Sequence, residues 1–257
     1  MNLTARQSSI VEIVEGEGFA TVEALAESFG VTTQTIRRDL RELCDRGVLR
    51  RRHGGVDLPV GAENLPYLTR QVLNLRQKRI IAALVADYVP DGASLAFSIG
   101  TTPEIVAQAL LGHRNLRIFT NNINVAMVAS QNASFEVTVA GGRLRNSDMD
   151  VLGLSAEEFF SAYKVDFGVF GVGGVDSDGS LLDFTEDEVR VRQSIRRNSR
   201  QSLLVLDYTK FGRSAHVRGG SIEEISVAFC DQAPPAGIQA LLARAKTELI
   251  VSGEAAA

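Results

Sequence analysis

The sequence predicts an α/β protein of two domains: a winged helix-turn-helix, then an open, mostly parallel sheet with helices between its strands. Three observations support this expectation. The length of 257 residues suits two domains, and 45% apolar against 23% charged residues is an ordinary globular balance. Short helical patterns with glycine stops fill the first 57 residues. From residue 76 onward, apolar runs of strand length alternate with amphipathic helical stretches.

Helical spacing and glycine stops define the predicted N-terminal domain, residues 3–57. Thr21 and Thr32 precede apolar-periodic stretches as N-caps, and Gly30 and Gly47 follow them as stops. The expected elements are a helix through Ile10, Ile13 and Val14, helices over 22–29 and 33–46, and a hairpin over 48–56. The two central helices, within residues 20–39, form the predicted helix-turn-helix.

Charge is distributed unevenly along this domain. The whole chain carries a formal charge of −4, which by itself argues against a nucleic-acid partner. Residues 37–52, however, hold seven arginines against three acidic residues, a local excess of +4. Such a cluster is the electrostatic footprint that a phosphate backbone requires. The alternative is an ordinary solvated helix face, on which runs of charge are common.

The helix expected at 33–46 separates its side chains onto two faces. At about 100° per residue, the apolar side chains that face the core are Ile36, Leu40 and Leu43. Gln34 and Arg38 fall on the opposite face, where an amide suits an adenine edge and a guanidinium a guanine edge. The side chains that suit phosphates are Arg37, Arg41 and the hairpin arginines. The alternative is an amphipathic helix in a small bundle.

Residues 58–75 form the expected linker, because Pro59, Gly61 and Pro66 interrupt the periodicity. The second domain, residues 76–251, alternates strands with helices. Strands are expected at 93–99, 116–120, 135–141, 165–172, 202–207, 225–230 and 247–251. Helices are expected at 76–89, 102–111, 123–131, 151–163, 185–199 and 238–245. This pattern predicts a Rossmann-like sheet, in which ligands bind beyond the carboxyl ends of the strands.

The end of the first strand has the features of a phosphate cradle. Gly100 permits close backbone approach, and Thr101 and Thr102 offer hydroxyl groups. Pro103 is expected at the first helical position, which makes Thr102 the N-cap. The free amides of a helix N-terminus attract anions. Helix capping alone is the alternative explanation of the Thr-Pro pair.

Further polar or glycine residues follow the later strands. Each glycine has an alternative explanation as a turn residue, and each first-turn carboxylate as a partner of the helix dipole. One of only four lysines follows the fifth strand and suits an anion. These residues are Asn121, Asn122, Gly141, Gly142, the run 171–174, Asp183, Glu186, Asp187 and Lys210.

Several other functions lack the residues that they need. No G-x-G-x-x-G follows the first strand and no G-x-x-x-x-G-K-[ST] occurs, so no dinucleotide or nucleoside triphosphate cofactor is expected. Cys44 and Cys230 fit no metal-ligand spacing, and three histidines offer little material for a zinc site or a catalytic triad. No apolar run reaches the ~18 residues of a membrane span, and the N-terminus lacks a signal-peptide pattern. A cytoplasmic protein is therefore expected.

Motifs in both domains occur in the order of a known family. Residues 31–40, VTTQTIRRDL, followed by Arg52-His53-Gly54-Gly55, resemble the DNA-binding signature of the DeoR-type transcriptional repressors. The second domain resembles the sugar-phosphate sensor of that family, which has the fold of ribose-5-phosphate isomerase and glucosamine-6-phosphate deaminase. Its matching motifs are Ile99-Gly100-Thr101-Thr102, Thr120-Asn121-Asn122, Gly141-Gly142 and Asp207-x-x-Lys210-Phe211-Gly212. Ser98 departs from the family, in which many members carry Asp.

The resemblance implies a repressor that leaves its operator DNA when a phosphorylated ligand binds the second domain. The stretches 100–122, 165–184 and 210–213 resemble family members that control glycerol catabolism, so the effector expected is a phosphorylated polyol, glycerol-3-phosphate. A winged-helix protein usually binds paired half-sites as a dimer, so a homodimer or homotetramer is expected.

The resemblance also completes the two sets of candidate residues. The expected DNA-binding residues are Thr32, Thr33, Gln34, Thr35, Arg37, Arg38, Arg41, Arg51, Arg52 and His53. The expected effector-binding residues are Gly100, Thr101, Thr102, Asn121, Asn122, Gly141, Gly142, Asp183, Glu186 and Lys210. The glycine and two threonines of 100–102 would hold the phosphate, with Lys210 nearby. No catalytic or metal-binding residue is expected.

Three alternatives stay open on the sequence alone. The first is a regulator of the same type that serves another sugar-phosphate pathway. The second is a sugar-phosphate isomerase with a DNA-binding appendage, for which Glu186 and Asp183 are candidate general bases. The third is an activator rather than a repressor, because the regulatory sign depends on the position of the operator.

Overall fold

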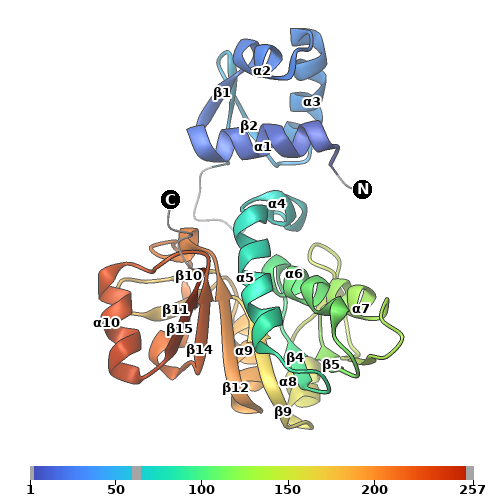
Figure 1. Ribbon diagram of the computed structural model, residues 1–257, viewed down its shortest axis with the longest axis vertical. Helices are drawn as coiled ribbons and strands as arrows, with labels where there is room; N and C mark the ends of the chain where they lie inside the picture. The colour runs from blue at the N-terminus through green and yellow to red at the C-terminus, as the bar shows by residue number, and fades with distance from the viewer. Residues whose placement is uncertain (1–2, 60–64, 253–257) are drawn as a thin grey trace. The chain divides into compact units, whose positions relative to one another are not determined.

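The computed structural model describes residues 3–59 and 65–252, which divide into two compact units, one up to Leu75 and one from Arg76. Each unit has its own hydrophobic core. The first is a helical unit with a small sheet, and the second is an α/β unit built on a parallel sheet (Figure 1). The predicted fold class is confirmed.

The first unit contains three helices around one core. They are α1 (Ala5–Glu17), α2 (Val22–Phe29) and α3 (Thr33–Asp45). Thr21 and Thr32 cap α2 and α3 as predicted: their hydroxyl oxygens accept from Ala24 N–H at 3.1 Å and from Thr35 N–H at 3.3 Å. Gly30 ends α2 with φ of 62°, in the left-handed region that favours glycine. The fully buried side chains here include Ile10, Val14, Leu25, Ile36 and Leu43.

The small sheet of the first unit, called the wing, has three strands instead of the two expected over residues 48–56. β3 (Gly55–Asp57) pairs antiparallel with both β2 (Arg50–Arg52) and β1 (Phe19–Thr21). A Cβ at Gly55 would lie 2.1 Å from the carbonyl oxygen of Ala20, so only glycine lets the two backbones approach this closely. β1 escaped prediction because three residues are too few to show an alternating pattern.

The second half of the expected linker is ordered against the first unit. It forms α4 (Tyr67–Val72), in which Tyr67 is buried. The Thr69 hydroxyl donates to the carbonyl oxygen of Gly47 at 3.0 Å, and the N–H of Asn74 donates to Glu15 Oε1 at 2.7 Å. Gly61, one of the residues that predicted the linker, lies outside the described residues.

Seven parallel strands form the sheet of the second unit, in the order β15-β14-β12-β9-β4-β5-β6. They are β4 (Ser94–Phe97), β5 (Arg117–Thr120), β6 (Glu136–Val139), β9 (Val165–Phe170), β12 (Ser199–Leu206), β14 (Val227–Cys230) and β15 (Glu248–Val251). The chain steps outward from β4 to β6, and then places β9 on the other side of β4. The strand order therefore reverses between β4 and β9, the point where open α/β sheets bind ligands.

Helices cover both faces of this sheet. They are α5 (Leu75–Tyr88), α6 (Thr101–Ala109), α7 (Ile123–Ala129), α8 (Leu154–Ser161), α9 (Glu186–Arg197) and α10 (Ala236–Ala245), with short 3₁₀ turns η1 (Leu110–Gly112), η2 (Tyr208–Lys210) and η3 (Ile222–Glu224). Phe160 of α8, Ile195 of α9 and Leu242 of α10 share one core cluster with Ala96 and Leu204 of the sheet. Figure 1 shows α5 and α6 on the opposite face.

Five short strands beside the main sheet were not predicted. They are β7 (Leu144–Arg145) and β8 (Asp150–Val151), which pair as a hairpin, and β10 (Gly174–Val175), β11 (Ser180–Asp183) and β13 (Val217–Ser221), which form a second small sheet. Because β8 occupies residues 150–151, α8 begins at Leu154 and not at Val151 as expected.

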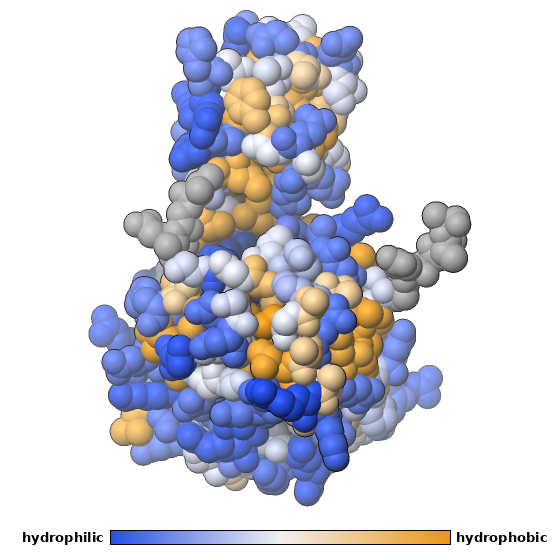
Figure 2. Space-filling model, turned by 90° about the vertical axis from the view of Figure 1, so that its left-hand side faces the viewer, coloured by the Kyte–Doolittle hydropathy of each residue, from blue (hydrophilic) through white to orange (hydrophobic). Residues whose placement is uncertain are grey.

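Apolar surface gathers on the face of the second unit that carries β15 and α10 (Figure 2). Leu249, Ile250 and Val251 are half-buried there, as is usual for a strand at the edge of a sheet. Within residues 3–59 and 65–252, no helix is long and apolar enough to cross a membrane.

Candidate DNA interface and ligand site

α3 exposes the arginine-rich face that its sequence predicted. Ile36 and Leu43 are fully buried and Leu40 is 5% exposed. The polar side chains on the solvent side are Gln34, Arg37, Arg38 and Arg41, all exposed. The predicted separation of the two faces is therefore confirmed. At the start of the helix the hydroxyl oxygens of Thr32 and Thr35 lie 3.0 Å apart, and Thr33 is half-buried.

Two exposed ion pairs lie on this surface. Arg37 Nη2 is 4.0 Å from Glu23 Oε1, and Arg38 Nε is 3.6 Å from Glu42 Oε1. Exposed pairs of this kind contribute about 0.2–1 kcal/mol. Arg37 can therefore exchange its carboxylate for a nucleic-acid contact at little cost, and the contact of Arg38 with Glu42 through Nε leaves its two terminal nitrogens to other partners.

The wing arginines divide between the two sides of β2. Arg50 Nη2 and Arg52 Nε contact Asp57 Oδ2 at 2.8 and 2.7 Å. The hydrogen bonds from Arg50, with the nearby charge of Arg52, hold the pKa of the Asp57 carboxyl below its ordinary value. Arg51 points to the other side, towards the Cys44 thiol, whose pKa is raised by burial. Sequence reasoning missed Asp57, whose partners are set by strand pairing.

At the wing tip, His53 and Gly54 are exposed in the turn between β2 and β3. Arg51 and Arg52, although engaged within the unit, are exposed too. The expected wing contacts are thus all accessible at one turn.

In the second unit, α6 begins two residues earlier than expected. Gly100 is its N-cap, with φ of 111°, and Thr101 is its first residue. The prediction that Thr102 is the N-cap and Pro103 the first helical residue is wrong. The unusual conformation of Gly100 lets the helix start early, and proline is tolerated within the first turn because its missing N–H has no intrahelical acceptor there.

The loops after β4, β5 and β9 converge around this helix start, beside β12. The Asn122 side-chain amide approaches the Gly100 carbonyl oxygen at 3.5 Å. A Cβ at Gly171, just after β9, would lie 4.0 Å from Pro103 Cδ and 3.4 Å from the Val205 carbonyl oxygen of β12. The structure therefore brings Gly100, Thr101, Thr102 and Asn122 together at the reversal of strand order.

Asn121 and Asn122 have distinct surroundings. Asn122 caps α7: its Oδ1 accepts from Asn124 N–H at 3.0 Å and from Val125 N–H at 3.4 Å. Asn121 is completely buried and its Nδ2 donates to the Val151 carbonyl oxygen at 2.7 Å. Among the described residues, Asn121 Oδ1 is buried with no hydrogen-bond partner. A buried unsatisfied acceptor is costly, so a donor from a ligand would be stabilising there.

Of the two glycines after β6, only Gly142 is required for packing. A Cβ at Gly142, whose φ is 148°, would lie 2.6 Å from Ser155 Oγ and 2.7 Å from Val151 Cγ1. Gly141 has open space at the same position. Gly142 thus lets this loop pack closely against β8 and α8, a reason that differs from the turn role considered for it in the sequence.

Asp183, at the end of β11, and Glu186, the first residue of α9, have different surroundings. Asp183 is buried and accepts from Arg192 Nε and from Gly173 N–H, both at 2.9 Å. Glu186 is exposed and pairs with Arg190 one turn later at 3.2 Å. Glu186 is therefore explained by its place in the first turn of α9, where it complements the helix dipole, and by its ion pair with Arg190. Asp183 is held in a buried ion pair with Arg192.

Lys210 lies in η2, directly after β12, and is half-buried. The loop is tied to the small sheet, since Gly212 N–H donates to the Val175 carbonyl oxygen at 2.8 Å. β12 neighbours β9, which neighbours β4, so Lys210 stands two strands from the Gly100 loop at the same edge.

A cluster of the half-buried Arg145 with two buried carboxylates was missed by sequence reasoning. Arg145 of β7 binds Asp150 through two hydrogen bonds of 2.9 and 2.7 Å, and Glu188 through one of 2.9 Å. Burial favours a lower pKa for the Arg145 guanidinium, but these carboxylates outweigh it and raise that pKa above its ordinary value. Asp150 also forms a backbone bridge with Asn122, so the cluster joins the loop after β5 to the first turn of α9.

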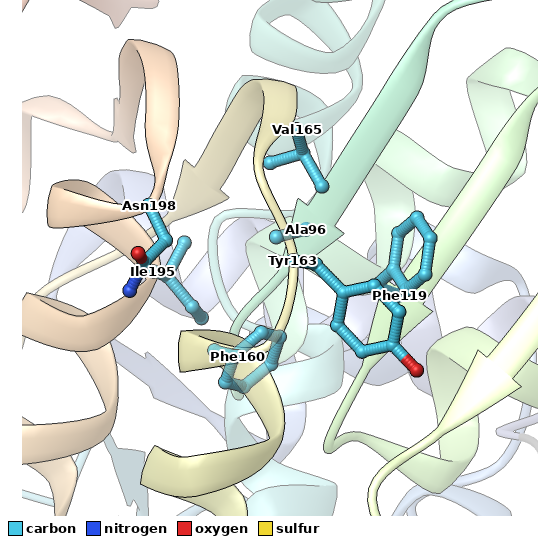
Figure 3. A pocket seen from close by; sticks show the side chains of 7 residues that line it. All are labelled: Ala96, Phe119, Phe160, Tyr163, Val165, Ile195 and Asn198. Carbon is cyan, nitrogen blue, oxygen red and sulfur yellow. The ribbon is translucent and has the colours of Figure 1, made fainter.

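Two hollows accompany these elements. A groove of about 490 Å³ opens beside the β7–β8 hairpin, lined by Arg143, Leu144, Arg145, Asn146, Leu152, Thr185 and Asp187. A second recess lies between the sheet, α8 and α9, lined by Ala96, Phe119, Phe160, Tyr163, Val165, Ile195 and Asn198 (Figure 3). That recess has no room for a water molecule and lies at the start of β9, away from the carboxyl ends of the strands. In the part of the chain that the structure describes, no cluster of side chains could hold a metal ion.

Family models match both units. The DeoR-like helix-turn-helix domain matches residues 6–60, and the DeoR C-terminal sensor domain matches residues 73–232. A solved structure of ribose-5-phosphate isomerase from Methanocaldococcus jannaschii aligns with a TM-score of 0.40 and 14% identity. The alignment covers 54% of this chain and 55% of the isomerase chain. That likeness is too distant to bear on ligand or activity.

Relatives match nearly the full length. The Glycerol-3-phosphate regulon repressor of Escherichia coli (strain K12) is 44% identical to this chain, over 94% of this chain and 96% of the length of that protein. The protein of that name from Haemophilus influenzae is 44% identical over 98% of both chains. The HTH-type transcriptional repressor CsqR of Escherichia coli is 38% identical over 97% of this chain and 95% of its own. These relatives are transcriptional repressors and not enzymes, which sets the isomerase alternative aside. This chain belongs to the DeoR family of DNA-binding transcriptional regulators.

Proposed function

We propose that this protein represses genes of glycerol or glycerol-3-phosphate metabolism and leaves its operator when glycerol-3-phosphate binds the second unit. The observation that carries the proposal is the 44% identity, over nearly the whole chain, to two proteins named Glycerol-3-phosphate regulon repressor. The exposed arginine face of α3 and the loops gathered at the strand reversal supply the two surfaces that such a switch needs.

On the DNA side, Gln34 and Arg38 read base edges in the major groove, as their place on the exposed face of α3 allows. Arg37, Arg41 and the wing tip contact phosphates. The contacts that the resemblance assigns to Thr32, Thr33 and Thr35 lie at the first turn of the same helix. Two copies of the chain bind two half-sites, with their spacing near a multiple of ~10 bp.

On the ligand side, the N-terminus of α6 binds the phosphate. Gly100 brings the backbone amides close, Thr101 and Thr102 add hydroxyl groups, and Lys210 adds a positive charge from two strands away at the same edge of the sheet. Asn121 Oδ1, buried without a partner among the described residues, accepts a hydrogen bond from a ligand hydroxyl. A phosphate and two hydroxyl groups are the chemistry that glycerol-3-phosphate presents.

Release requires that the ligand bind the DNA-incompetent state more tightly than the competent state. The test is fluorescence anisotropy of the full chain on DNA from upstream of neighbouring glycerol genes, at fixed salt. Glycerol-3-phosphate is titrated against glycerol and against other sugar phosphates. Release by glycerol-3-phosphate alone supports the proposal. Release only by a different phosphate would contradict the glycerol assignment and leave a repressor, and absence of specific DNA binding would contradict the proposal as a whole.

A further inference from the structure

The side chain of Gln7 is fixed at both ends of its amide. It forms a capping box with Thr4: Gln7 N–H donates to Thr4 Oγ1 at 3.2 Å, and Thr4 N–H donates to Gln7 Oε1 at 3.1 Å. Because Oε1 is the acceptor in this box, Nε2 must donate elsewhere. It donates to Glu42 Oε2 at 2.7 Å, and Gln7 is only 2% exposed.

Glu42 belongs to α3, and its second oxygen faces the arginine at the centre of the proposed DNA surface. Glu42 Oε1 lies 3.6 Å from Arg38 Nε, one helical turn away. With its Nε side turned to Glu42, Arg38 has its two terminal nitrogens on the far side, and its side chain is 82% exposed. A guanine offers O6 and N7 to two such nitrogens in the major groove.

The contact between Gln7 and Glu42 is not needed to dock α3 on α1. Arg6 Nε already binds the buried Asp39 of α3 at 2.6 Å. Ile36 and Leu43 pack in the same core cluster as Ile10 and Val14 of α1. An additional, partly buried hydrogen bond that ends on the carboxylate beside Arg38 is therefore available for another use.

We infer that Gln7 and Glu42 are positioning residues that orient Arg38 towards a guanine. Gln7 fixes one oxygen of the Glu42 carboxylate, and the other oxygen holds the Nε side of Arg38. The inference rests on the proposed function, in which Arg38 reads a base. It assigns sequence specificity to a residue of α1, a helix that the proposed function does not place on DNA.

The test uses the full chain and a duplex selected by the wild-type protein from a random library. Dissociation constants are measured by anisotropy for that duplex and for each single base-pair replacement, at several salt concentrations. Arg38→Ala identifies the base pair that Arg38 reads. Glu42→Gln removes the carboxylate charge and keeps an oxygen that can accept from Gln7. Glu23→Gln is the matched control, because it removes the same charge facing Arg37, at 4.0 Å.

We expect Glu42→Gln to reduce discrimination by roughly two- to fivefold at the Arg38 base pair alone, with Glu23→Gln unchanged there. The double variant Gln7→Glu/Glu42→Gln reverses the hydrogen bond between positions 7 and 42. In this variant the amide is at position 42 and donates to the carboxylate at position 7. It should keep the thermal stability of the wild type and recover part of the discrimination that Glu42→Gln loses, because the amide oxygen at position 42 then faces Arg38 Nε and can accept from it. Full discrimination in Glu42→Gln, or an equal loss of affinity on every duplex, would overturn the inference while leaving the DNA-binding function intact. If Arg38→Ala changes no base preference, the base-reading role itself is wrong.

Discussion

Removing the Arg145 guanidinium should destabilise the second unit strongly. Arg145→Ala leaves Asp150, which has no exposed surface, and Glu188, which is 7% exposed, without their shared cation. Breaking a buried ion pair by removing one partner costs about 3–5 kcal/mol. The Arg145 side chain is itself 28% exposed, so water can partly replace it. We therefore expect a loss near the lower limit, about 3 kcal/mol.

The assay is urea unfolding followed by far-UV circular dichroism, since the chain has no tryptophan. The two units have separate cores, so two transitions are expected, and only that of the second unit should shift. Arg143→Ala, an exposed neighbour on the same hairpin, should change the free energy of unfolding by less than about 0.5 kcal/mol. The triple variant Arg145→Met/Asp150→Asn/Glu188→Gln should lose less free energy of unfolding than Arg145→Ala, because it leaves no unpaired carboxylate at positions 150 and 188. A loss in Arg145→Ala no larger than in Arg143→Ala would refute the reasoning.

Four further predictions concern the two proposed surfaces. Arg38→Ala should weaken operator binding by about 1–3 kcal/mol and relax the preference at one base pair, as measured by anisotropy on base-substituted duplexes. Thr101→Val should leave operator affinity unchanged and raise the glycerol-3-phosphate concentration needed for release about tenfold, because a hydrogen bond to a charged group is lost; loss of DNA binding in a folded variant would contradict the assignment of that loop. Gly55→Ala should destabilise the first unit and weaken DNA binding, because its Cβ would lie 2.1 Å from the Ala20 carbonyl oxygen; an unchanged unfolding midpoint would show that the strands can separate freely. The lowered pKa of Asp57 means that its pairing with Arg50 and Arg52 stabilises the wing above the ordinary aspartate pKa and is lost as the pH falls through the lower folded value; Asp57→Asn should remove that part of the acid dependence seen in pH-dependent unfolding.

The sequence by itself determined the features that depend on local periodicity. The apolar runs predicted all seven strands of the main sheet, because buried parallel strands are apolar on both faces. The spacing of Ile36, Leu40 and Leu43 predicted which side of α3 is exposed, because helical geometry alone sets that face. Motif order predicted the family for the same reason, since each motif is a short continuous stretch.

The tertiary structure alone decided which distant residues meet. Arg145 and Glu188 are 43 positions apart, and Gln7 and Glu42 are 35 apart, so no local pattern links them. The early start of α6 depends on the positive φ of Gly100, whereas the Thr102-Pro103 pair predicted a start two residues later. The short strands β1, β7 and β8 form only because a partner strand or loop lies beside them, since two or three residues have too little burial of their own to show a period. Ion pairs and strand edges of this kind are set by the packing of whole elements, and that packing is a property of the folded chain rather than of any one segment.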